Sequence, residues 1–378
     1  MRFRLPKTCA ALLLAVAGCG DPAPAAGPTP WKMEVEDASV RVDPQVVTVG
    51  PKDVWVFGGR GSADKTRWPT ARHWNGKSWS KADLPGGRIG AVRAAGASST
   101  SDVWAVTESG ADGTVLRWDG ARWTVAQHLP GFSVTDMEVF SPQDIRLYGT
   151  GERTSGGLCW SHTASGWSKT TLPFMPSHTS ARSARDVWAL TFEGTLHHYN
   201  GLDWKEVPLG DVLPSTKRHH LMERGHLLEI TATADGIWIT VEDVGGIPSQ
   251  KGSAEEDDFP YRPMAPPGPD LSSLLLHGDP TGNRWTAESI MGKTGRLSQF
   301  GAPIIDADGG VWLIGSFDVN AYESALAYRT PTGTWTRTKI RTSRFRDFEV
   351  RAFARIPGST RFLVAGRDDE RGAILSTR

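Results

Sequence analysis

The chain has 378 residues, of which 42 are lysine or arginine and 42 are aspartate or glutamate, so its formal net charge is zero. A broad surface for nucleic acid or an anionic membrane needs a basic excess, and this balance argues against both kinds of partner. The length is ample for one large folded body, and the 16 tryptophans are the unusual feature of the composition.

The N-terminus has the features of an export signal. Basic residues within the first seven positions precede the apolar run 10–17, which is too short to span a bilayer and ends in small residues. The segment resembles a bacterial lipoprotein signal, in which Gly18 is the last residue removed and Cys19 becomes the lipidated N-terminus. An ordinary secretory signal is the alternative. We therefore expect residues 1–18 to be a lipoprotein signal peptide and the protein to be exported and lipid-anchored to the bacterial cell membrane or outer membrane, facing outside the cytoplasm.

The segment 19–30 follows the signal and is rich in proline and alanine. Such a composition cannot form a core and favours an extended, semi-rigid chain. We interpret it as a tether between the lipidated cysteine and a single folded domain over 31–378.

A tryptophan repeat runs through this domain. Seven tryptophans each lead to a short apolar strand with a large residue at its centre, and a third aromatic often precedes them; the seven are Trp31, Trp79, Trp123, Trp167, Trp204, Trp285 and Trp335. The strand centres are Trp55, Trp104, Arg146, Trp188, Trp238, Trp312 and Phe362. Units of about 40 to 50 residues with strand chemistry indicate an all-β fold, a β-propeller of seven four-stranded blades.

Local chemistry assigns the strands within a blade. Branched and aromatic residues in 53–57, 102–106 and 186–190 predict the second strand. Asn-Gly or Asp-Gly between aromatic ends, as in 73–79 and 117–123, predicts a tight hairpin with a type I′ turn that joins the third and fourth strands.

The two chain ends are incomplete and complementary. The last blade lacks a fourth strand after 372–376, and the segment 31–35 precedes any complete blade. The mature N-terminal strand is therefore expected to complete the C-terminal blade and close the ring, so that no sheet edge stays open.

Trp68 is the one tryptophan that the repeat does not place. It follows the second strand of the first blade in the segment 60–68, which we expect to be a loop at the ligand face. Trp68 is either a packed loop anchor or a stacking contact for a ligand, with Arg60, Lys65 and Arg67 donating hydrogen bonds to anionic or sugar groups.

The segment 242–270 departs from the repeat, with an acidic run and several prolines. It predicts a long loop between the second and third strands of the fifth blade, either a disordered insertion or a lid that binds a partner.

No group of residues predicts a catalytic or metal site, and no cofactor is expected. The polar clusters without a metal-ligand spacing are His197, His198, His219, His220 and His226 with Glu223, and Asp306, Asp308 and Asp318. Cys159 is the only cysteine outside the N-terminal segment, and we interpret it as a small core residue.

The blades resemble those of kelch-type and bacterial regulator-type propellers. The kelch likeness is carried by Val54-Trp-Val-Phe-Gly-Gly59, and the regulator likeness by Asp306-Ala-Asp-Gly-Gly-Val-Trp312. The resemblance implies a fold and no particular activity, because propellers host many functions.

Two functions stay open. The first is a non-catalytic, membrane-anchored binding or scaffolding module, monomeric, for an envelope protein or a glycan. The second is an envelope enzyme acting on carbohydrate, either a sialidase-like hydrolase or a kelch-type oxidase. Because the sequence supplies no catalytic constellation, binding is the preferred hypothesis.

Overall fold

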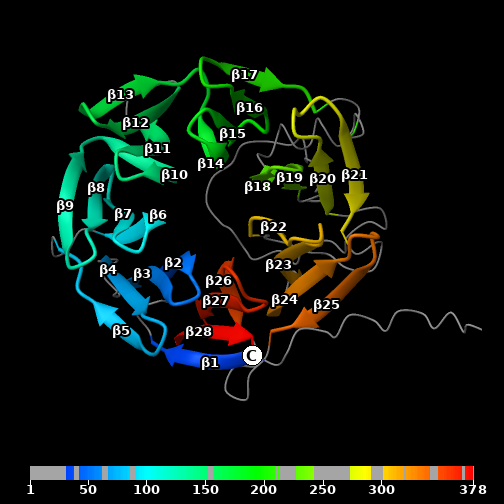
Figure 1. Ribbon diagram of the computed structural model, residues 1–378, viewed down its shortest axis with the longest axis horizontal. Coiled ribbons are helices and arrows are strands. Elements are labelled where there is room, and N and C mark those ends of the chain that lie inside the picture. The colour runs from blue at the N-terminus through cyan, green and yellow to red at the C-terminus, as the bar shows by residue number, and fades with distance from the viewer. Residues whose placement is uncertain are drawn as a thin grey trace, which may run out of the picture.

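The protein is an all-β ring of seven four-stranded antiparallel sheets, the blades of a β-propeller (Figure 1). The computed structural model describes residues 31–37, 42–61, 67–85, 90–151, 156–209, 212, 227–241, 273–290, 301–318, 321–340, 348–367 and 371–377. Within this part of the chain, no helix is long and apolar enough to cross a bilayer. The seven four-stranded sheets confirm the predicted fold class.

Each blade is a meander, so strands that are consecutive in sequence pair with one another, and the first strand lies nearest the centre of the ring (Figure 1). The strands of blades 1 to 3 are β2 (Val42–Gly50), β3 (Asp53–Gly61), β4 (Arg67–Trp74), β5 (Trp79–Ala82); β6 (Ala91–Ser99), β7 (Asp102–Ser109), β8 (Asp112–Trp118), β9 (Trp123–Leu129); and β10 (Phe132–Ser141), β11 (Asp144–Gly151), β12 (Gly157–Thr163), β13 (Gly166–Thr171).

The remaining blades follow the same order. Their strands are β14 (Pro176–Ser183), β15 (Asp186–Thr191), β16 (Leu196–Tyr199), β17 (Trp204–Val207); β18 (Leu227–Thr233), β19 (Gly236–Val241), β20 (Leu274–Gly278), β21 (Trp285–Ser289); β22 (Ile304–Ile305), β23 (Val311–Asp318), β24 (Ala321–Arg329), β25 (Trp335–Lys339); and, in blade 7, β26 (Glu349–Arg355), β27 (Phe362–Arg367) and β28 (Gly372–Thr377).

The outer strand of blade 7 comes from the other end of the domain. β1 (Trp31–Glu36) pairs antiparallel with β28, from Trp31 opposite Thr377 to Glu36 opposite Ala373. A polar contact crosses this junction, because Glu34 Oε1 accepts hydrogen bonds from Ser376 Oγ at 2.6 Å and from Arg361 Nη2 at 3.3 Å. The first and last strands of the chain thus share one sheet.

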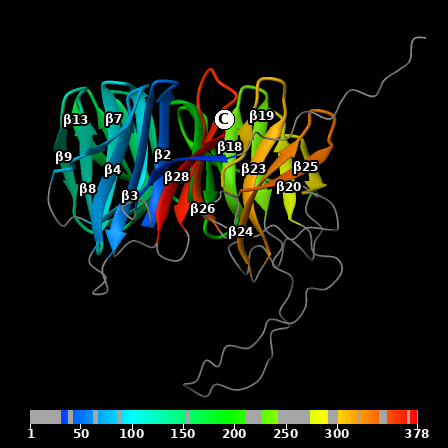
Figure 2. The same ribbon diagram turned by 90° about the horizontal axis from the view of Figure 1, so that it is seen from below.

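The strands stand between two faces of the ring (Figure 2). Because the strands alternate in direction, the turns after the first and third strands of a blade emerge on one face, which we call the 1–2 face. The turns after the second strand and the connections to the next blade emerge on the opposite face, which we call the 2–3 face.

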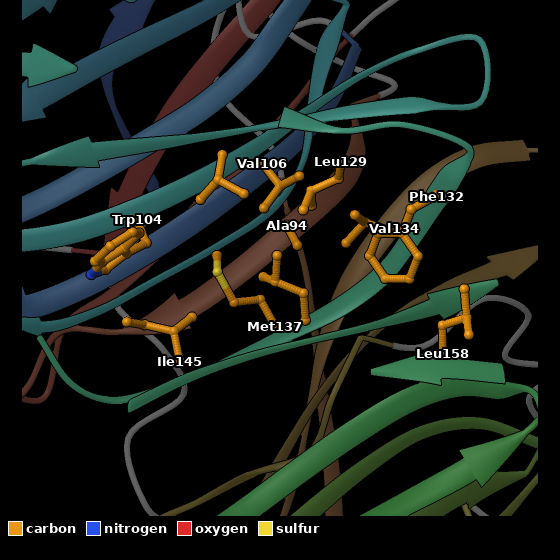
Figure 3. Packing of buried hydrophobic residues seen from close by; sticks show 11 residues of the cluster. Ala94, Trp104, Val106, Leu129, Phe132, Val134, Met137, Ile145 and Leu158 are labelled. Carbon is orange, nitrogen blue, oxygen red and sulfur yellow. The ribbon is translucent and has the colours of Figure 1, made fainter. Parts of the chain in front are cut away.

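The core lies between the blades. The cluster between blades 2 and 3 joins Trp104, Val106 and Leu129 to Phe132, Met137 and Leu158 (Figure 3). Trp55, Trp104 and Trp188 are among the largest fully buried side chains. Burying an aromatic side chain contributes roughly 1.5–3 kcal/mol to the free energy of unfolding. The large residues are buried between blades, so each blade is stabilised by packing on its neighbour.

Five blades cover the central tryptophan of the second strand in the same way. The residue directly opposite on the third strand stacks on the indole, with ring centroids 3.8 to 4.1 Å apart where that residue is aromatic. In blade 2 the Arg117 guanidinium takes this place, 5.0 Å from the Trp104 ring centroid. The stacking pairs are Trp55 with His73, Trp104 with Arg117, Trp188 with His198, Trp238 with His277, and Trp312 with Tyr328.

The aspartate that begins several second strands holds this stack in place. In blade 4, Asp186 Oδ1 accepts hydrogen bonds from Trp188 Nε1 at 3.0 Å and His198 Nε2 at 2.9 Å. Asp102 plays the same part in blade 2. The Asp-Val-Trp sequence is therefore a structural unit, because the carboxylate satisfies donors on two strands.

The predicted hairpins between third and fourth strands are present, but their turns have four residues. In blade 1, Asn75 Oδ1 accepts hydrogen bonds from the backbone N–H groups of Lys77 and Ser78, both at 3.0 Å. Gly76 has a φ of +89°, a conformation that favours glycine. The side chain of Asn75, and not a type I′ backbone, thus closes the turn.

Blade 3 departs from the stacked-tryptophan pattern. Arg146 occupies the central position of its second strand and lies opposite Ser161. Its guanidinium donates to Ala184 O at 2.6 Å and lies over the ring of Tyr199, at 5.2 Å from the centroid. Cys159 in the same sheet is buried, as predicted.

Candidate functional site

Three of the sequence-predicted ligand residues of blade 1, Arg60, Arg67 and Trp68, lie in paired strands. Trp68 is in β4, where it pairs with Arg60 of β3, so the expected loop over 60–68 is wrong at its two ends, which are in strands. Residues 62–66 lie outside the described part of the structure. In the glycine pair of blade 1, a Cβ on Gly59 would lie 2.8 Å from the Ala91 Cβ. Close approach of blade 2 requires glycine there, and the strand continues through it.

Trp68 keeps partial solvent contact on the 2–3 face. The backbones of Arg60 and Arg67 are paired in the hairpin, whereas their side chains and the whole of Lys65 lie outside the described part of the structure. A ligand site formed by these four residues stays a prediction.

Several other predictions fall on residues that the structure does not describe. These residues are Gly18 and Cys19, the segment 242–270, and His219, His220, Glu223 and His226. His197 and His198 are described, and each stacks on an aromatic ring of the fold, Phe174 and Trp188 respectively. Among the described residues, no group of three or more histidine, cysteine, aspartate or glutamate side chains could hold a metal ion.

Asp306 in blade 6 organises a turn. Its carboxylate accepts hydrogen bonds from the backbone N–H groups of Asp308, at 3.1 Å, and Gly310, at 2.6 Å. It also accepts one from Trp312 Nε1 at 3.3 Å. These bonds explain the acidic sequence by turn closure.

Six of the seven innermost strands, all but β22, have a bulge near the 2–3 face. The register shifts between Val134 and Asp136 in β10, between Pro176 and His178 in β14, and between Leu227 and Glu229 in β18. Bulges re-aim side chains and are common beside functional sites. Here they precede three ionisable residues on three consecutive blades.

The residues after these bulges form a cluster of acidic groups and one histidine. We call Asp136, Glu138, His178, Thr179 and Glu229 the axial cluster, because all five lie on innermost strands.

Hydrogen bonds and an ion pair connect the axial cluster across two blade boundaries. The backbone N–H of Thr179 donates to Asp136 Oδ2 at 2.6 Å, and Thr179 Oγ1 donates to Glu138 Oε1 at 3.1 Å. His178 Nδ1 lies 3.4 Å from Glu229 Oε2. The cluster thus joins blade 3 to blade 4 and blade 4 to blade 5.

The carboxyl groups of the axial cluster hold protons more tightly than ordinary ones. Burial raises the pKa of Glu138 to about 8, and the neighbouring Asp136 carboxylate adds to the rise. Burial likewise raises the pKa of Glu229 to about 7 against the attraction of His178, and raises that of Asp136. All three carboxyl groups keep partial contact with solvent, which moderates the rise in their pKa values.

A cationic group of a ligand would offset the negative charge of the axial cluster. The cluster contains three carboxyl groups and one histidine, whose charge acts on Glu229 and Asp136, so negative charge accumulates on deprotonation with little compensation inside the cluster. Arg146 acts on Glu138 only through space. An ammonium or guanidinium group supplied by a ligand would favour the ionised carboxylates and displace their protons.

Sequence reasoning missed the axial cluster because its members are far apart in the chain and lie in strands that vary between blades. A usable signal was present in the alignment of blades. Asp136, His178 and Glu229 occupy corresponding positions, where the register resumes after the bulge, and the other bulged innermost strands carry Gln45, Ala94 and Ala352 there.

Many solved structures have a similar fold. No protein-family model and no curated protein matches the chain. Among solved structures, it is similar to YCF48 bound to a D1 peptide, with 14% identity over 92% of this chain and 96% of that chain and a TM-score of 0.58.

Two further structures illustrate the range of functions on this fold. A catalytically inactive virginiamycin B lyase from Staphylococcus aureus with quinupristin has 13% identity and a TM-score of 0.60, covering 92% of this chain and 100% of that one. The β-propeller domain of Cps50 (Swd1) from Myceliophteria thermophila has 12% identity and a TM-score of 0.56, with the same coverage. At such identities the likeness establishes the propeller fold alone.

Proposed function

We propose that the protein is a non-catalytic binding module of the cell envelope, lipid-anchored through Cys19, that holds a protein or glycan partner at its ring. The observation that carries the proposal is the axial cluster, where Asp136 and Glu138 of blade 3 accept hydrogen bonds from Thr179 of blade 4, and Glu229 of blade 5 pairs with the neighbouring His178. The YCF48 structure, with its bound peptide, supports a propeller of this shape in a binding role.

The chemistry of the axial cluster favours a partner with a cationic group. Raised pKa values mean that the carboxylates gain most from a positive neighbour, since binding stabilises the form that the protein alone disfavours. A lysine or arginine side chain of a protein partner meets this need. The partner would gain affinity as pH rises from 6 to 8, over the range where Glu229 and Glu138 lose their protons.

Calorimetric titration with a defined probe tests this function. The probe is acetyl-Gly-Lys-Gly-amide, and its neutral control is the same peptide with the lysine acetylated. The parent protein should bind the probe more tightly than the control, and Glu138→Gln should weaken binding by roughly tenfold, the loss of one charge-assisted hydrogen bond.

The matched control variant is Glu193→Gln, because Glu193 is an exposed carboxylate on the turn between β15 and β16. It should bind the probe as the parent does. Equal binding of lysine and acetyl-lysine peptides, or equal loss in both variants, would contradict a cation site at the axial cluster.

The lipid anchor is tested separately. Cys19→Ser should release the protein from the membrane fraction or leave the signal uncleaved, because the thiol is the only lipid attachment point in the proposal. A parent protein found in the soluble fraction with an N-terminus other than residue 19 would overturn the anchor and leave the binding role intact.

One observation favours an enzyme as the second candidate. His178 and Glu229 form an acid–base pair at the ring centre, and a carboxyl pKa of about 7 suits proton transfer at neutral pH. The candidate is a propeller-fold enzyme acting on carbohydrate, a sialidase-like hydrolase or a kelch-type oxidase. Product formation from sialosides or galactosides that Glu229→Gln abolishes, with probe affinity retained, would favour it over binding.

A further inference from the structure

A groove opens between blades 2 and 3 on the 1–2 face, away from the blade 1 hairpin that carries Trp68. It has a volume of about 270 Å³. Its walls are Arg117 of β8, the turn between β10 and β11 at 142–143, and the end of β12 with the following turn, including His162 and Thr163. The volume is enough for one acidic side chain or one sugar residue.

The guanidinium of Arg117 is held rigidly at one wall. Its Nε donates to Asp102 Oδ1 at 3.1 Å, its Nη2 lies 3.0 Å from the same oxygen, and its face covers Trp104. Asp102 is nearly fully buried, and its other oxygen accepts a hydrogen bond from Ser98 Oγ at 2.6 Å. The carboxylate therefore fixes one edge of the guanidinium and leaves its other N–H groups for an acceptor in the groove.

His162 of blade 3 supplies a second donor to the groove. Burial lowers the pKa of His162, and the positive charge of Arg117 lowers it further against the pull of Asp102, so the imidazole is neutral at pH 7. Its Nδ1 is buried, with no hydrogen-bond partner among the described residues. An N–H on that atom would be a stranded donor, so we assign the proton to Nε2 of this groove-lining residue.

These two donors match a carboxylate. A fixed guanidinium and a neutral imidazole N–H can each donate to one of two coplanar oxygens, and a single cation suits one negative charge. Asp144, which follows the turn at 142–143, is directed to Arg146, with its Oδ1 3.7 Å from the Arg146 Nε. It therefore does not occupy the donors of the groove.

We propose that this groove is a carboxylate-binding site, in which Arg117 of blade 2 and His162 of blade 3 hold the two oxygens of one carboxylate. The site goes beyond the proposed function and does not depend on the axial cluster. Because the donors come from different blades, an occupied groove also joins blade 2 to blade 3.

The test is a titration of the mature protein followed by ¹⁵N and ¹H NMR. Two carboxylate probes distinguish the sources of the group: acetyl-glutamate methylamide stands for an acidic peptide and glucuronate for an acidic sugar. Their neutral counterparts are acetyl-glutamine methylamide and glucose. We expect one or both carboxylates to shift the His162 Nε2 and Arg117 Nε resonances, and the tighter probe identifies the source.

Variants assign the binding to the groove. His162→Phe keeps an aromatic ring between Trp104 and Trp167 while removing the donor, and should weaken the better probe by roughly tenfold. Arg117→Lys keeps the charge beside Asp102 but loses the fork, and should weaken it similarly. Arg122→Lys, at a side chain that is 80% exposed on the neighbouring turn, should change nothing.

Three results would overturn the proposal. These are equal binding of a carboxylate and its neutral counterpart, no shift of the His162 resonance at saturating carboxylate, and unchanged affinity in His162→Phe. None of them bears on the lysine probe of the axial cluster, so failure here and failure of the proposed function can be told apart.

Discussion

The second and third strands of the blades differ from the innermost strands in how regularly their side chains repeat. In the second and third strands, five blades repeat one arrangement, an indole with a stacked side chain opposite. In the innermost strands the backbone repeats through its bulges, but the side chains do not, and ionisable groups gather on three blades. The repeated stacks build the fold, and the residues that depart from the repeat form the axial cluster.

Arg146 shows where the two regions meet. It replaces the central tryptophan in blade 3, and its charge acts on Glu138 of the adjoining innermost strand. The blade with the irregular second strand is thus the blade that supplies two of the three acidic groups in the axial cluster. If the comparison holds, damage to the repeat should cost stability and damage to the axial cluster should cost binding.

The largest effect is expected from removing the outer strand of blade 7. Deleting residues 20–37 exposes the edge of β28 and removes Trp31 from a buried cluster, so we expect aggregation or a large fall in melting temperature. Deleting only residues 20–30 is the matched control and should leave the melting temperature unchanged. Equal melting temperatures for both deletions would show that β1 is dispensable.

The next largest effect is expected from the repeat itself. Trp104→Ala leaves a cavity between blades 2 and 3 and should lower the free energy of unfolding by about 3–5 kcal/mol in chemical denaturation. Val125→Ala, at a side chain that is 39% exposed, should cost well under 1 kcal/mol and serves as the control. A loss for Trp104→Ala as small as that of the control would mean that the blades do not rely on the indole.

A smaller effect is expected from the aspartate that holds the stack. Burial opposes ionisation of Asp186, but hydrogen bonds from Arg182 and His198 outweigh it and lower its pKa. Its contribution to stability is therefore present above its ordinary pKa of 3.8 and is lost as pH falls through the lower folded value. Asp186→Asn should cost about 1–2 kcal/mol at pH 7 and less at pH 3.

The matched control for this prediction is Asp203→Asn, because Asp203 is exposed on the turn before β17. Denaturation of both variants at pH 7 and pH 3 is the measurement. An equal cost at both pH values would contradict the assignment of a charge-dependent role to Asp186.

The sequence was sufficient for the architecture because a propeller repeats its core. Trp104, Trp188 and their relatives recur at blade intervals, so the blade count and strand order could be predicted from one chain. It was not sufficient for Trp68, since the strand pairing continues to Arg60 and Trp68, beyond the apolar run 53–57 that predicted the strand. The axial cluster could not be predicted either, because three-dimensional closure alone brings Asp136 and Glu229 together.

The smallest effect on stability, opposite in sign, is expected at the axial cluster. Glu138 and Glu229 have raised pKa values in the folded state, so the stability they contribute is full below pH 4.5 and is lost as pH rises to about 8. Glu138→Gln should raise the free energy of unfolding at pH 8 by about 1 kcal/mol, after allowing for solvent screening, and change it little at pH 5. Glu193→Gln should be neutral at both.

The most direct test of the comparison is the titration of the Glu138 side-chain carboxyl followed by its ¹³C resonance. We predict a midpoint near pH 8 in the protein alone, and a lower midpoint when acetyl-Gly-Lys-Gly-amide is bound, because the ammonium group favours the carboxylate. A midpoint at the ordinary pKa of 4.5 that the probe does not move would contradict a cation-binding cluster at the centre of the ring.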